Sequence, residues 1–125
     1  MAIKARLFSC LALLTALFGS CGYSFAEDPL FERDIRPLLE KHCVKCHSGA
    51  RRKSGLDLRQ RRLALRGGDN GPAMVPGKSG QSAMYKLASA GKMPPGKLQK
   101  LSPEELDLLA RWIDTGAATL AKEEA

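Results

Sequence analysis

Two cysteines and a histidine follow one another at residues 43–47, in the order Cys-Val-Lys-Cys-His. This spacing is the attachment pattern of c-type haem. Two thiols separated by two residues can add to the two vinyl groups on one edge of a porphyrin, and the next residue then presents an imidazole to the iron. The pattern therefore predicts one covalently bound haem c, with thioethers at Cys43 and Cys46 and with His47 as the proximal iron ligand.

Other uses of this cysteine pair are possible but have fewer matching features. A zinc site needs four nitrogen or sulfur ligands, and beyond the motif the candidate nitrogen is that of the adjacent His42, with no second cysteine pair. A thioredoxin-like pair would follow a strand of a βαβ unit, and no such strand is indicated. A disulfide between the two thiols would close too short a loop to stabilise the fold much. We expect His42 to be a hydrogen-bonded surface or core histidine on the proximal side.

The sixth iron ligand has to reach the opposite face of the porphyrin, from a segment far along the chain from His47. Met93 meets this requirement, because two consecutive prolines follow it and restrict the movement of its loop. Met74, in a Met-Val-Pro-Gly stretch, is the competing candidate. Met84 shares a predicted helix face with leucine and alanine, so we expect it to fill the core. A methionine ligand favours ferrous iron and raises the reduction potential.

The N-terminal segment, residues 1–26, has the pattern of a secretory signal peptide. Lys4 and Arg6 precede a twelve-residue apolar run, and small residues end at Ala26. The run is too short to span a bilayer as a helix, and c-type haem is attached beyond the cytoplasmic membrane, so the two signals agree. We expect a periplasmic protein cleaved after Ala26. The alternative is lipoprotein processing before Cys21, which would leave a lipid anchor on that residue and bring the protein to the membrane.

The composition limits the mature chain, residues 27–125, to one small domain. The net charge of +7 falls to +5 when the signal peptide removes Lys4 and Arg6. Hydrophobic residues at 44% and charged residues at 26% are ordinary globular values and exclude a disordered tail or a membrane channel. Aromatic residues make up only 6% of the 125 residues, so a porphyrin would supply part of the core.

Seven cationic side chains and a single acidic one, Asp57, lie between Arg51 and Arg66. Nucleic acid is not an expected partner of such a run in an exported protein. Two roles suit its arginines: bidentate pairing with haem propionates, and a positive face that attracts an acidic redox partner. A solvated basic loop without either role is the third interpretation.

The segment before the cysteines is predicted to be helical. Asp28 and Pro29 have the residue types of a helix cap and a first helical position. Apolar residues then recur at helical spacing as far as Cys43. Pro37 lacks a backbone donor, so we expect either a kink there or a helix that begins near Arg36.

The middle of the chain is expected to hold short helices separated by turns. One lies within the apolar stretch 56–65, before two glycines, and another covers 81–88 and ends before Gly91. Residues 93–96, Met-Pro-Pro-Gly, must form an irregular loop, because consecutive prolines permit neither a helix nor strand pairing.

The last helix has the clearest signals. Ser102, Pro103 and Glu105 form a capping box with proline at the first helical position, and Gly116 ends the helix. The predicted buried stripe consists of Leu106, Leu109, Ala110 and Ile113. Because no alternating run indicates a strand, the predicted fold class is all-α, with three or four helices around one covalently bound haem.

These stretches resemble the planctomycete-type cytochrome c domain over nearly all of residues 30–117. The resemblance is carried by Phe31–Leu38, Cys43–His47, Gly55–Leu58, Gly67-Gly68, Gly71–Gly77, Lys92–Pro95 and Trp112–Ala117. It implies a small domain like the class I cytochromes c, with haem held by the two motif cysteines, His47 as proximal ligand and Met93 as distal ligand. The position of Met74 is usually not methionine in that family, which weakens the case for Met74.

These observations predict a monohaem carrier that moves single electrons and is not an enzyme. Paired carboxylates, an activated serine and an open metal site are not apparent, and a six-coordinate iron leaves no position for a substrate. Because the chain ends eight residues after Ala117, we expect a stand-alone carrier whose redox partner is a separate protein. The alternative is a five-coordinate haem sensor or peroxidase-like protein, which would follow if Met93 does not bind iron.

Overall fold

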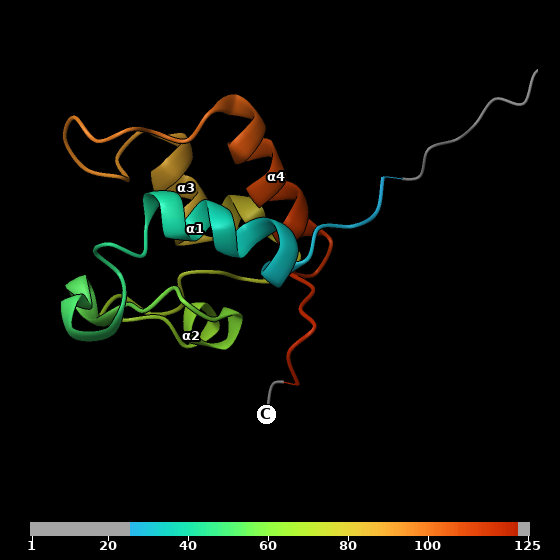
Figure 1. Cartoon of the computed structure of the whole chain (residues 1–125), viewed down its shortest axis with the longest axis horizontal. Coiled ribbons are helices and arrows are strands. Elements are labelled where there is room, and N and C mark those ends of the chain that lie inside the picture. The colour runs from blue at the N-terminus through green and yellow to red at the C-terminus, as the bar shows by residue number, and fades with distance from the viewer. Residues whose placement is uncertain (1–25, 123–125) are drawn as a thin grey trace, which may run out of the picture.

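The computed structural model describes residues 26–122, which form a small all-α domain (Figure 1). Its α-helices are α1 (Arg36–His42), α2 (Arg61–Arg66), α3 (Ala83–Ser89) and α4 (Pro103–Asp114). A π-turn lies at Phe31–Ile35, and 3-10 turns lie at Gly49–Arg51, Lys53–Gly55 and Ser79–Gln81. No strand occurs within residues 26–122, which confirms the predicted fold class. Among these residues no helix is long and apolar enough to cross a bilayer.

The proposed signal peptide, apart from Ala26, lies outside the described residues, as does Cys21. The boundary between signal peptide and mature domain therefore stays a prediction.

The first helical segment begins later than the sequence suggested. Its N-cap is Leu30, whose backbone N–H donates to the Asp34 carboxylate at 2.8 Å. The predicted cap at Asp28 was wrong. The helical segment begins with a π-turn, and the Leu30 N–H at its start lies within reach of the Asp34 side chain of the same turn. A hydrogen bond from Arg33 lowers the pKa of Asp34, so this carboxylate stays an acceptor.

Pro37 occupies the second position of α1, two residues after the π-turn ends at Ile35. Proline has no N–H, and its ring crowds the carbonyl of the preceding turn. The wider turn before it is closed by Ile35 and Arg36, whose N–H groups donate to carbonyls five residues earlier. Both expectations for Pro37 therefore hold, since the backbone is irregular before it and a regular α-helix starts at Arg36.

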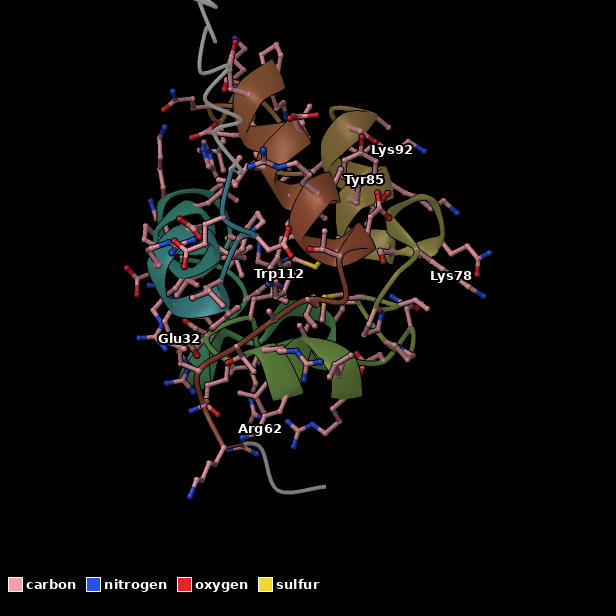
Figure 2. The ribbon with its side chains drawn as sticks, turned by 90° about the vertical axis from the view of Figure 1, so that its right-hand side faces the viewer. Glu32, Arg62, Lys78, Tyr85, Lys92 and Trp112 are labelled. Carbon is pink, nitrogen blue, oxygen red and sulfur yellow. The ribbon has the colours of Figure 1, made fainter. Side chains whose placement is uncertain are left out.

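The core joins the π-turn to α4. The rings of Phe31 and Trp112 are almost fully buried, with centroids 5.8 Å apart. The Ala118 carbonyl accepts from the Phe31 N–H at 2.9 Å and from the Trp112 indole N–H at 3.0 Å. The segment after α4 thus fastens the first turn to the last helix, and Figure 2 shows Trp112 in the interior between them.

The helix α4 begins and ends as predicted. Ser102 accepts from the Glu105 N–H at 3.2 Å, and the Glu105 carboxylate accepts from the Ser102 N–H at 2.9 Å, which completes the capping box. Gly116 follows the helix with φ of 103°, a conformation that glycine adopts without strain. The predicted buried stripe of α4 omitted Trp112, which is buried together with Leu109 and Ile113. Leu106 and Ala110, which the prediction included, are only partly buried.

The helix α3 starts two residues later than predicted, because a 3-10 turn takes up Gln81. The hydroxyl of the fully buried Ser82 fixes this turn, since it donates to the Lys78 carbonyl at 2.9 Å and accepts from the Val75 N–H at 2.9 Å. The helix α2 lies at the end of the expected 56–65 stretch and stops at Gly67.

Two glycines allow a close backbone crossing after α2. A Cβ atom on Gly67 would lie 1.9 Å from the Gly71 carbonyl oxygen, and one on Gly68 would lie 2.1 Å from the Ser54 carbonyl oxygen. Real Cβ contacts are never so short, so a side chain at either position would push two backbone segments apart. The crossing supports the loop that follows the cysteine motif.

Candidate functional site

A cavity of about 380 Å³ brings the predicted site residues together. Cys43, Cys46, His47 and Met93 all line it. Its other walls are mainly apolar and include Leu38, Leu39, Leu56, Leu58, Leu87 and Leu109. We call residues 47–59 the proximal loop and residues 93–101 the distal loop. Both lie on one side of the molecule, at the C-terminal end of α1 (Figure 1).

Both thiols of the motif are free and partly buried. Burial raises the pKa of Cys43 to about 11, and the neighbouring Cys46 adds to the effect. A thiol with such a pKa stays protonated at neutral pH, unlike the reactive thiolates of disulfide oxidoreductases. No group of three or more His, Cys, Asp or Glu residues within 26–122 could hold a metal ion. The geometry gives no support to the zinc and thioredoxin-like alternatives.

The proximal loop orients His47. Its Nδ1 lies 3.2 Å from the Lys53 carbonyl oxygen. Because a carbonyl oxygen can only accept, Nδ1 carries the proton, and Nε2 keeps the free lone pair that an iron ligand needs. The Leu58 N–H donates to the His47 carbonyl at 2.9 Å, so the far end of the loop returns to its start.

A buried carboxylate closes the proximal loop. Asp57 is 3% exposed, and it accepts from the Arg59 guanidinium at 2.7 Å and from the Arg59 N–H at 3.0 Å. These contacts, with a further hydrogen bond from the Gly49 N–H, lower the pKa of Asp57 to about 2. In the sequence, Asp57 stands out only as the single acidic residue in a basic run, and this isolation was the available signal of a pairing role.

Met93 is the methionine on the distal loop. Its side chain lines the cavity, and the residue is 37% exposed. The Met93 N–H donates to the Leu87 carbonyl at 3.0 Å, and the Lys100 ammonium donates to the Pro94 carbonyl, so backbone contacts hold the loop on both sides of Met93.

The other two methionines within residues 26–122 occupy different surroundings. Met74 is 1% exposed in the hydrophobic core and is not among the residues that line the cavity. Met84 packs against the core, as expected, but it also lines the cavity, which its helix periodicity could not show. The geometry therefore favours Met93 over Met74.

His42 is hydrogen-bonded on both sides of its ring, as expected. Its side chain is 1% exposed, with Nε2 3.0 Å from Glu105 Oε2 and Nδ1 3.3 Å from the Gln99 carbonyl oxygen. Lys41 donates to the other Glu105 oxygen at 2.8 Å. The hydrogen bond from Lys41, with smaller contributions from the Ser102 N–H and His42, lowers the pKa of Glu105 to about 2.

The arginines of the basic segment do not line the cavity. The lysines that do so are Lys41 and Lys45. Arg59 is paired with the Asp57 carboxylate of the proximal loop. The Arg61 guanidinium donates to the Ala117 carbonyl, in the segment after α4. This arrangement gives no support to the expected pairing of these arginines with haem propionates.

Residues 43–97 match the family model described as planctomycete cytochrome C. The matched segment covers less than half of the 125 residues. It contains all four predicted site residues, and the resemblance drawn from the motifs is confirmed over this segment. The match to a cytochrome c family suggests a c-type haem protein. Comparisons with curated proteins and with solved structures gave no match.

The donor set around the cavity fits a covalently bound haem c. Two free thiols stand near the end of α1, an imidazole has its Nδ1 occupied by a carbonyl, and a thioether lies on a separate loop. The mainly apolar walls suit a flat, hydrophobic macrocycle.

Proposed function

We propose that this protein is an exported monohaem c-type cytochrome that carries single electrons, with His47 and Met93 as iron ligands. The observation that carries the proposal is the cavity itself, which two free thiols, an oriented imidazole and a thioether line together. When bound, the haem supplies the one-electron couple between ferrous and ferric iron.

The residues of the chain set how such a group is held. Cys43 and Cys46 fix the porphyrin edge to the end of α1, and the Lys53 carbonyl keeps His47 in one tautomer and makes its Nε2 more basic. Leucine side chains exclude water from the walls, which lowers the local dielectric and strengthens the influence of nearby charges on the potential. The titratable His42 is held by hydrogen bonds on both sides, so it is not free to act as an acid or base on a substrate.

The proposed partner is a separate redox protein with an acidic docking surface. From residue 70 to residue 103 the chain has five lysines and neither Asp nor Glu. Lys92 precedes the distal loop, and Lys97 lies within it, next to the cavity-lining Leu98. Figure 2 shows Lys78 and Lys92 extending outward on the side of α3. An acidic partner would be attracted to this side as well as to the basic segment, at a rate that falls with ionic strength.

The ferric absorption spectrum tests the proposal. We expect the protein, purified from a host with cytochrome maturation, to show a methionine-to-iron charge-transfer band that is lost in Met93→Ala. Met84→Leu is the matched control, because Met84 also lines the cavity, and it should keep the band. High-spin ferric iron in the wild type would contradict the proposal and favour a five-coordinate sensor or peroxidase-like protein. A haem-free product would contradict both.

The proposed location is the periplasm. Mass spectrometry of the mature protein should show an N-terminus at Glu27. A lipidated N-terminus at Cys21 would instead indicate a membrane-anchored carrier.

A further inference from the structure

A second cavity, of about 340 Å³, lies at the N-terminal end of α1. Arg36, the first residue of α1, lines it together with Arg61 and Arg62 of α2 and with Lys122, the last residue that the structure describes. Among the described lining residues, Glu32 alone carries a carboxylate. Figure 2 shows Glu32 and Arg62 on either side of the segment that follows α4. The lining thus carries four positive charges against one negative charge.

Three of these cations have no ion-pair partner within residues 26–122, namely Arg36, Arg62 and Lys122. The guanidinium carbon of Arg36 lies 5.6 Å from the centroid of the Phe31 ring, and Arg62 Nε donates to the side-chain oxygen of Gln60 at 2.8 Å. These contacts orient the two guanidinium groups without neutralising them. Because like charges around one hollow repel each other, a bound anion would lower the electrostatic energy of this part of the fold.

The negative charge of the lining is already used to build one wall of the cavity. The Glu32 carboxylate accepts from the Thr119 hydroxyl at 2.6 Å and from the Leu120 N–H at 2.9 Å. Arg61 Nε donates to a backbone carbonyl of the same segment. These contacts hold the segment that precedes Lys122 against the helical part of the domain, so the cationic groups face one hollow from three parts of the chain.

We propose that this cavity binds a small oxyanion with two or more negative charges, of the phosphoryl or polycarboxylate class. Guanidinium groups match the paired oxygens of phosphates and carboxylates, with which they form bidentate hydrogen bonds. The excess of positive charge favours a multivalent anion over a monovalent one. The volume, about 340 Å³, lies at the lower end of the range for small-molecule sites, roughly 300–1,000 Å³.

This site is separate from the haem cavity. The two cavities share no lining residue among those described. Arg36 begins α1 and lines the anion site, whereas His42 ends α1 and lines the haem cavity, which puts about 9 Å of helix rise between them. The inference therefore goes beyond the proposed electron transfer and does not depend on the iron ligands.

Calorimetric titration of the purified protein with pyrophosphate, and separately with citrate, tests the proposal. At about 0.15 M ionic strength, where unspecific attraction between separated charges is screened, we expect saturable binding of at least one of these anions at one site. Tighter binding of pyrophosphate would indicate a phosphoryl ligand, and tighter binding of citrate a polycarboxylate. Arg62→Gln should weaken the binding by about tenfold or more, because a charge-assisted hydrogen bond is lost.

Arg66→Gln is the matched control. It removes the same charge from an exposed position of the same helix, and Arg66 does not line the cavity. Its affinity for either anion should stay within about threefold of the wild type, since only a screened, longer-range attraction is lost. Arg36→Gln, at an exposed position of α1, should behave like Arg62→Gln.

Amide NMR spectra of the wild type show where the anion binds. We expect shifts for lining residues such as Gln60, Thr119 and Ala121. Failure of both anions to bind would overturn the proposal, as would equal weakening by Arg62→Gln and Arg66→Gln, or shifts confined to the haem cavity. Thermal unfolding shows whether the variants fold, and if they do not, the wild-type shifts decide alone. A wild type without the methionine-to-iron band would defeat the proposed ligation and leave this test unaffected.

Discussion

The proximal and distal loops carry the two proposed iron ligands, and they are fastened by different chemistry. The proximal loop is closed by the Asp57 carboxylate, which stays ionised down to about pH 2, and it rests on the backbone crossing at Gly68. The distal loop is held by the His42 ring and by the lysine that reaches Pro94. The difference teaches that a buried charged pair fixes the loop of His47, whereas the loop of Met93 depends on contacts with backbone carbonyls.

The largest expected effect comes from removing the covalent attachment on the proximal side. Replacing Cys43 and Cys46 by alanine should abolish covalently bound haem, because no thioether can form. Met93→Ala should retain it, since the distal ligand takes no part in attachment. Haem staining after denaturing electrophoresis measures both. Covalent haem in the double cysteine variant would contradict attachment at Cys43 and Cys46.

The next largest effect should come from the crossing beneath the proximal loop. Gly68→Ala places a methyl group against the Ser54 carbonyl, and we expect it to lower the free energy of unfolding by about 3 kcal/mol or more. Gly80→Ala is the control, because nothing lies within 4 Å of a Cβ atom there, and its effect should be within about 0.5 kcal/mol. Chemical denaturation measures both. Equal stability of the two variants would contradict the tight crossing.

The carboxylate of the proximal loop gives a pH-dependent test. Asp57→Asn should cost about 1–3 kcal/mol at neutral pH, because the hydrogen bonds to Arg59 lose their charge. The folded pKa is lowered from 3.8 to about 2, so this stabilisation is present above 3.8 and is lost as the pH falls to about 2. The difference between wild type and variant should therefore shrink over that interval in denaturation experiments. Asp107→Asn, at an exposed position of α4, is the control, and its effect at neutral pH should be within about 0.5 kcal/mol.

The smallest effect is expected beside the distal loop. Glu105→Gln weakens the capping box and the contacts with Lys41 and His42, at a cost of about 1 kcal/mol, because the carboxylate is partly exposed. Its folded pKa is lowered from 4.5 to about 2, so the loss should be full above 4.5 and should fade as the pH falls towards about 2. Thermal unfolding against pH measures it. A cost larger than that of Asp57→Asn would reverse the comparison of the two loops.

Features set by neighbouring residues could be predicted from the sequence. The cysteine motif, the capping box at Ser102 and the glycine at 116 each depend on residues within a few positions of one another. The irregular loop at Met93 followed from its two prolines in the same way.

Features set by distant partners could not be predicted. His42 finds its acceptors 57 and 63 residues further along the chain, and no local pattern announces them. Trp112 was missed from the buried stripe because its indole N–H depends on the carbonyl of Ala118, beyond the end of the helix. The cap at Asp28 failed for a related reason, since a π-turn changes which N–H groups are free.

The buried position of Trp112 has an optical consequence. It is the only tryptophan in the chain and is fully buried in the core. In a domain this small, a bound porphyrin lies close enough to accept its excitation energy, so the folded holoprotein should emit little tryptophan fluorescence. Unfolding would separate the indole from the porphyrin and restore the emission, so the chain carries its own fluorescent reporter of folding without any added label.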